Sequence, residues 1–144
     1  MKPFRFRLAA LLDIRKHART QQQARLAEAL DAETAVGEQI SQLAAELAAA
    51  RQTLGLGPLA IAKLQESARW SSAVEARRQV LEERQEQLAA EVEHCRAAVL
   101  DADREVRRLE NLRETQRQRW RGAAELQASK ELDEAGLMRH RMSL

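Results

Sequence analysis

Arginine gives this 144-residue sequence most of its capacity for chemistry. The chain holds 24 basic residues, 20 of them arginine, against 22 acidic ones. The guanidinium group is always charged and presents a planar fork of donors that suits carboxylates and phosphates. Residues 1–25 carry a net charge of +6 and residues 104–121 carry +4, whereas residues 26–103 carry −7. Unless these blocks are merely solvated helix faces, they predict an acidic partner, because crowded like charges cost stability.

No arrangement of residues predicts catalysis. His17, His94 and His140 lack the spacing of metal ligands, and the GLGP segment lacks the lysine of a phosphate-binding loop. The single cysteine, Cys95, lies on an apolar stripe and is expected to be a small buried side chain. We therefore expect no enzyme activity, no metal and no cofactor.

Four aromatic side chains could anchor a partner. Trp120 lies on an apolar stripe, and we expect it to face Leu8, with Phe4 and Phe6 nearby, as a hydrophobic clamp. Trp70 lies outside that stripe and is either a cap for a turn or an exposed anchor. Exposed aromatic residues are typical of binding hot spots.

Helices must position these residues. The chain is 44% hydrophobic, mostly Ala and Leu, but only 3% aromatic, with five Gly and two Pro. A β-sheet fold needs more turns and more β-branched or aromatic residues. The longest apolar stretches fall far short of the roughly 20 residues that span a bilayer, and the start is not a secretory signal. The composition is typical of a cytoplasmic all-α coiled coil.

Two stretches carry apolar residues at the alternating spacing of four and three that defines a heptad. In the first, the stripe passes through Val36, Ile40, Leu43 and Leu47. In the second, it covers fifteen positions between residues 74 and 123, eleven of them apolar. The strict period predicts a left-handed coiled coil of two helices.

The glycines and prolines set the expected boundaries. We expect helix one at about residues 4–53, a short helical connector at 54–70, helix two at about 71–134 and a frayed tail at 135–144. Ser71 or Ser72 is a candidate N-cap for helix two. The connector contains LGLGP, which is the only strong breaker cluster in the interior. The whole chain is then a single antiparallel coiled-coil domain.

The pairing of the helices follows from this hairpin. If Leu54 lies opposite Val74, paired residue numbers sum to about 128. Residue 8 then faces residue 120, and residue 15 faces residue 113. Both basic blocks are therefore expected at the end that carries the termini, with the acidic stretch toward the turn.

Two further functions stay open at this point. An arginine-rich nucleic-acid binder would need aromatic side chains interleaved with its arginines, and none are present, so we expect no nucleic acid as partner. A coiled-coil scaffold would self-associate side by side and bury Leu100 and Leu112. We expect a monomer instead.

Three passages together resemble the FliJ family of flagellar type III export proteins. They are KPFRFRLAALLDIRKH at the start, LENLRETQRQRW late in the second helix, and KELDEAGLMRHRM near the end. Injectisome stalk proteins look similar. The resemblance implies a coiled-coil stalk that inserts its terminal end into the hexameric export ATPase and also contacts the export gate protein and export chaperones. It implies a location in the cytoplasm, held at the inner membrane through these partners.

The resemblance and the positions of the residues suggest two sets of contacts. The ATPase ring is expected to contact Arg5, Phe6, Arg7, Arg15, Arg19, Arg113, Arg117, Arg119, Trp120 and Arg121. The cytoplasmic domain of the gate protein is expected to contact Trp70, Ala76, Val80, Glu83 and Gln87.

Overall fold

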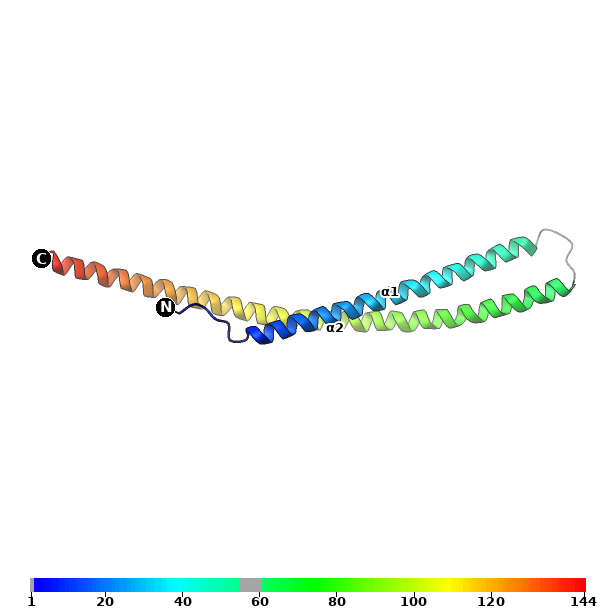
Figure 1. The fold of residues 1–144 in the computed structure, drawn as a ribbon, viewed down its shortest axis with the longest axis horizontal. Coiled ribbons are helices and arrows are strands. Elements are labelled where there is room, and N and C mark those ends of the chain that lie inside the picture. The colour runs from blue at the N-terminus through cyan, green and yellow to red at the C-terminus, as the bar shows by residue number, and fades with distance from the viewer. Residues whose placement is uncertain (1, 55–60) are drawn as a thin grey trace. The chain divides into compact units, whose positions relative to one another are not determined.

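Two long helices make up the computed structural model, which describes residues 2–54 and 61–144. Helix α1 covers Ala9–Leu54, and helix α2 covers Ile61–Met142. These described stretches contain no strand. They fall into a terminal part, residues 2–20 and 101–144, and a central part, residues 21–54 and 61–100. In each part α1 runs alongside α2 in the opposite direction (Figure 1), which confirms the expected helical hairpin.

The heptad stripes form the contact between the helices. Of the fifteen stripe positions expected in α2, thirteen are buried or half-buried, and the exceptions are Arg113 and Ala123. In α1 the positions from Val36 to Ala50 are likewise buried or half-buried. The period of the sequence therefore identifies the buried face of both helices.

Each part has its own small core. In the terminal part, Leu12 and Val106 are almost fully buried, at 2% and 0% exposure. In the central part, Ala29, Val92 and Cys95 form a buried cluster. Cys95 is buried with a free thiol, as its place on the stripe predicts. One stripe per helix is a thin core, so the stability of each part depends on few side chains.

The N-terminal segment departs from the expected boundary, because α1 begins at Ala9 and not near residue 4. The segment before Ala9 is not helical. The Ala9 amide donates to the Phe6 carbonyl at 3.2 Å, and the Leu12 amide donates to the Leu8 carbonyl at 2.9 Å. Pro3 has no amide hydrogen to donate, and the backbone around it is engaged by a side chain of α2 described below.

Helix α2 is longer at both ends than its expected range of 71–134. Residues 61–70 belong to it, so Ser71 and Ser72 lie inside the helix and are not caps. Residues 61–70 contain neither Gly nor Pro, and nothing in them interrupts helix propagation. The expected connector residues 55–60, including most of the breaker cluster, lie outside the described residues.

The C-terminal tail is helical to Met142 and does not fray at residue 135. Helix α2 passes through Gly136, and the described chain holds no glycine with a positive φ. Basic residues in the last turn oppose the negative end of the helix dipole. The Ser143 hydroxyl closes the last turn by donating to the His140 carbonyl at 2.8 Å.

The register differs by a few residues from the expected sum of 128. In the terminal part, Arg19 pairs with Asp103, a sum of 122, and Lys16 pairs with Glu110, a sum of 126. Trp120 packs against Phe4, which was expected near it, and the residue expected to face it, Leu8, is 37% exposed. The contact of Trp120 with Phe4 is part of the expected clamp.

Candidate functional site

Trp120 of α2 holds the N-terminal segment, residues 2–8. Its ring lies 6.1 Å from the Phe4 ring, centroid to centroid, at an interplanar angle of 49°. Its indole Nε1–H donates a hydrogen bond of 3.2 Å to the carbonyl oxygen of Lys2. Trp120 and Phe4 are both half-buried. The segment is thus fastened to α2 by one aromatic contact and one backbone acceptor.

Two open hollows share Trp120 and Phe4, and we call them together the Trp120 groove. The larger, of about 810 Å³, is also lined by Lys2, Pro3 and Arg5. The smaller, of about 600 Å³, lies against further side chains of the N-terminal segment, α1 and α2. Its other lining residues are Phe6, Ala9, Arg113, Arg117 and Arg121. The groove therefore combines aromatic rings with cations.

The arginines of the groove are not neutralised within the described residues. Arg113, Arg117 and Arg121 are spaced by four along α2, which places them on one side of the helix. None of them has an ion pair or hydrogen-bond partner within residues 2–54 and 61–144. The nearest acidic residue in sequence, Glu114, accepts a hydrogen bond from Gln118 at 3.4 Å.

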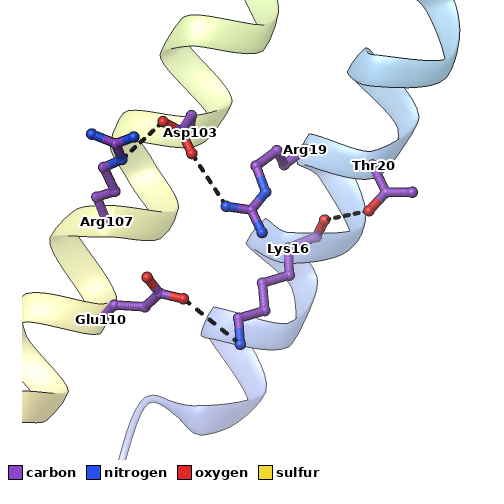
Figure 2. Close-up of polar contacts among 6 residues, drawn as sticks. All are labelled: Lys16, Arg19, Thr20, Asp103, Arg107 and Glu110. Atoms are coloured by element: carbon purple, nitrogen blue, oxygen red, sulfur yellow. Dashed lines mark hydrogen bonds and ion pairs between the residues drawn. The ribbon is translucent and has the colours of Figure 1, made fainter.

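Farther from the groove, cations of the terminal part are paired across the two helices. Figure 2 shows Lys16 and Arg19 reaching from α1 toward carboxylates of α2. The Lys16 ammonium lies 3.8 Å from Glu110, and the Arg19 guanidinium lies 3.2 Å from Asp103. Asp103 also binds Arg107 at 2.9 Å. The pairs Lys16–Glu110 and Arg19–Asp103 form the interhelical ladder, and Arg107 supports it from within α2.

Further along α2, Arg104 and Arg108 are paired with acidic residues of the same helix. Of the eleven described cations of the terminal part without an ion pair, seven lie in residues 2–8 and 113–121, and the others are Arg15, Lys130, Arg139 and Arg141. By sequence, residues 1–20 and 101–144 hold sixteen basic and ten acidic groups, a net charge of +6, whereas residues 21–100 hold eight and twelve, a net charge of −4.

The structure brings together six of the ten residues expected to contact the ATPase ring. Those six line the Trp120 groove: Arg5, Phe6, Arg113, Arg117, Trp120 and Arg121. Arg7, Arg15 and Arg119 are exposed but do not line it. Arg19 is already ion-paired with Asp103.

The residues expected to contact the gate lie on α2 in the central part. All of them are exposed: Trp70, Ala76, Val80, Glu83 and Gln87. Trp70 is 39% exposed and Val80 is 64% exposed. The last four follow the same spacing of four and three as the buried stripe, so they form a parallel stripe on the outer side of the helix.

Side chains of the types that bind metal ions do not cluster in the described residues. Within them, no group of three His, Cys, Asp or Glu side chains could hold a metal ion. Neither α1 nor α2, over its described length, contains a stretch long and apolar enough to cross a bilayer.

The sequence did not single out Lys2, Asp103 or Glu110. Lys2 enters the site through its carbonyl oxygen, which no side-chain pattern reveals. Asp103 and Glu110 carry a detectable signal, because each directly follows an apolar stripe position of α2, and flanking positions of opposite charge pair across a coiled coil. A correct register was needed to match them with Arg19 and Lys16.

Comparison with known proteins gives one match. No curated protein and no solved structure matches the chain. The model of the family described as "Flagellar FliJ protein" matches residues 4–144, which is nearly the whole chain. The chain therefore belongs to the FliJ family of flagellar proteins.

Proposed function

We propose that this protein is the stalk of the flagellar export ATPase and inserts its terminal part into the hexameric ring. Membership of the FliJ family makes it a component of the flagellar type III export apparatus. The finer assignment rests on one observation, the unpaired arginines that surround the half-buried Trp120. Charge left unneutralised on the free protein favours an acidic partner at that place.

The proposed mechanism follows from a difference in symmetry. A single helical hairpin has no six-fold axis, so it contacts the six ring subunits unequally. Subunits that meet the arginines are stabilised relative to those that do not, which biases ring assembly and the order of nucleotide turnover. The stalk thereby increases ATPase activity without taking part in the chemistry of hydrolysis.

The central part supplies the proposed link to the export gate. Trp70 and the outer stripe from Ala76 to Gln87 are exposed and are separate from the buried stripe. We assign them to the cytoplasmic domain of the gate protein. Export chaperones are further proposed partners, and these contacts place the protein at the cytoplasmic face of the inner membrane.

ATPase activity of the cognate enzyme, measured with and without the protein, tests the proposal. We expect stimulation by the wild type and a loss of most of it when Arg113, Arg117 and Arg121 are all changed to Glu. The matched control changes Arg51, Arg69 and Arg77 to Glu, because these are also exposed arginines and the change in charge is identical. The absence of stimulation by the wild type, or equal losses in both triple variants, overturns the proposal.

A further inference from the structure

We infer that the Trp120 groove is a binding site for an extended acidic peptide segment that carries one apolar side chain, and that ring subunits supply this segment. The inference rests on the proposed function for the source of the segment only. The chemistry of the segment follows from the groove itself.

The first argument concerns charge. Some arginines outside the groove, such as Arg104 and Arg108, are within 3.6 Å of a carboxylate on the same helix, whereas others, such as Arg15, have no ion pair among the described residues. Arg113, Arg117 and Arg121 have the same freedom to pair, yet no carboxylate of the described residues neutralises them. The first turn of α1, which begins at the groove with Ala9, also contains no acidic residue to offset its positive dipole end. Three cations at successive turns of α2, beside aromatic rings, favour a ligand that carries negative charge.

The second argument concerns spacing. Residues four apart on a helix are separated by about 6 Å along its axis. Alternate side chains of an extended chain are separated by about 6.6 Å and point to the same side. A peptide that lies along α2 can therefore offer alternate carboxylates to Arg113, Arg117 and Arg121, and each guanidinium can bind its carboxylate with two parallel hydrogen bonds.

The third argument concerns the apolar side chain. Phe4, Phe6 and Trp120 bring three aromatic rings to the groove, and Ala9 leaves space beside them. A purely ionic ligand would leave these rings in contact with water. Nucleic acid fits less well, because base stacking needs a free ring face and Phe4 already packs against Trp120.

Tryptophan fluorescence can measure this binding directly on the full chain. The Trp70→Phe variant leaves Trp120 as the single tryptophan. The probe is a short synthetic peptide in which glutamates alternate with serines around one central leucine, and the matched peptide has serine in place of leucine. We expect saturable quenching or enhancement of Trp120 emission, with about tenfold tighter binding of the leucine peptide.

Charge variants distinguish binding of the peptide in the groove from non-specific electrostatic attraction to the protein. In the Trp70→Phe background, Arg117→Glu is expected to weaken binding of the leucine peptide by about tenfold. Arg77→Glu makes the same change in charge at an exposed arginine of the central part, outside the groove lining, and should weaken it by less than about threefold. Circular dichroism checks that both variants remain helical. Equal affinities for the two peptides, equal effects of the two variants, or tighter binding of a single-stranded oligonucleotide or of anionic lipid vesicles overturns the inference.

The ATPase assay distinguishes this inference from the proposed function. If the wild type stimulates the ring, the leucine peptide added in excess should compete and remove the stimulation. If stimulation persists both with the peptide present and in the Arg117→Glu variant, the stalk function is supported. The inference that ring subunits bind in the Trp120 groove is then wrong. Peptide binding without any stimulation by the wild type overturns the stalk function and supports the groove as an acidic-peptide site.

Discussion

At the scale of single residues, Asp103 binds one arginine from each helix of the terminal part. Its carboxylate accepts from Arg19 of α1 and from Arg107 of α2, and its side chain is 27% exposed. We expect Asp103→Ala to lower the free energy of unfolding by about 1 kcal/mol, because two half-screened pairs are lost together. Urea unfolding followed by circular dichroism measures the change.

The control for this prediction is Asp101→Ala. Asp101 is 75% exposed and pairs only with Arg104 on its own helix. Its removal should change the free energy of unfolding by less than about 0.5 kcal/mol. If the two variants lose the same stability, the interhelical ladder does not stabilise the pairing of α1 with α2.

Trp120 makes a second prediction at this scale. The N-terminal segment is held to α2 by the Phe4 ring and the Lys2 carbonyl, and both contacts are made to Trp120. In Trp120→Ala the segment should detach, so trypsin should cleave after Arg5 and Arg7 several times faster than in the wild type. Mass spectrometry of a digestion time course identifies the cuts, and Trp70→Ala, which changes the tryptophan of the central part, should leave their rate unchanged.

At the scale of elements, the sequence predicts the buried face of both helices but not where they begin. Apolar spacing repeats for many heptads, so many positions independently predict the same buried stripe from Val74 to Trp120. The start of α1 depends instead on one carbonyl and one ring near Trp120, and the continuation of α2 through residues 61–70 depends on the absence of any breaker. Neither is a periodic feature.

The register illustrates the same limit. The expected sum of 128 depends on placing Leu54 opposite Val74, and the sequence between them does not fix this pairing to better than a few residues. The pairs Arg19–Asp103 and Lys16–Glu110 give smaller sums than expected. An error of this size does not change the expectation that both basic blocks lie in the terminal part, because that expectation depends only on the antiparallel direction of the two helices. The residue that is predicted to face Trp120, in contrast, changes when the register shifts by a few residues.

A glycine inside α1 gives a prediction for this scale. Gly37 has ordinary helical geometry, and a Cβ added there would meet the Gln85 side-chain nitrogen at 3.6 Å, an ordinary contact. Gly37→Ala should therefore raise the free energy of unfolding by about 0.5–1 kcal/mol, since glycine loses more backbone entropy in a helix. Thermal and urea unfolding measure the gain.

Gly122 provides the comparison for that variant. It lies in α2 beyond Trp120, and a Cβ added there meets nothing within 4 Å. From residue 125 onward the side chains are exposed, so an added methyl group has little to pack against there. Gly122→Ala should increase helical content but leave the unfolding midpoint nearly unchanged. A stabilisation equal to that of Gly37→Ala would indicate that the end of α2 unfolds together with the paired helices.

At the scale of the whole molecule, the tendency to self-associate distinguishes a stalk protein from a coiled-coil scaffold. Leu100 and Leu112 are 51% and 40% exposed, and a scaffold would bury them against a second copy. Single exposed leucines are normal on a soluble surface, and a stable dimer needs roughly 1,000 Å² or more of well-packed interface. We therefore expect sedimentation equilibrium at micromolar concentration to give the mass of one chain.

The charge distribution decides how that experiment must be done. The terminal part is net positive and the central part net negative, so two copies can attract each other weakly at low ionic strength. Such association disappears at physiological salt, where the Debye length is about 8 Å. A dimer that persists in salt and dissociates in the double variant Leu100→Lys, Leu112→Lys would contradict the stalk and support the scaffold. A monomer at both salt concentrations leaves the unpaired arginines available to a different protein.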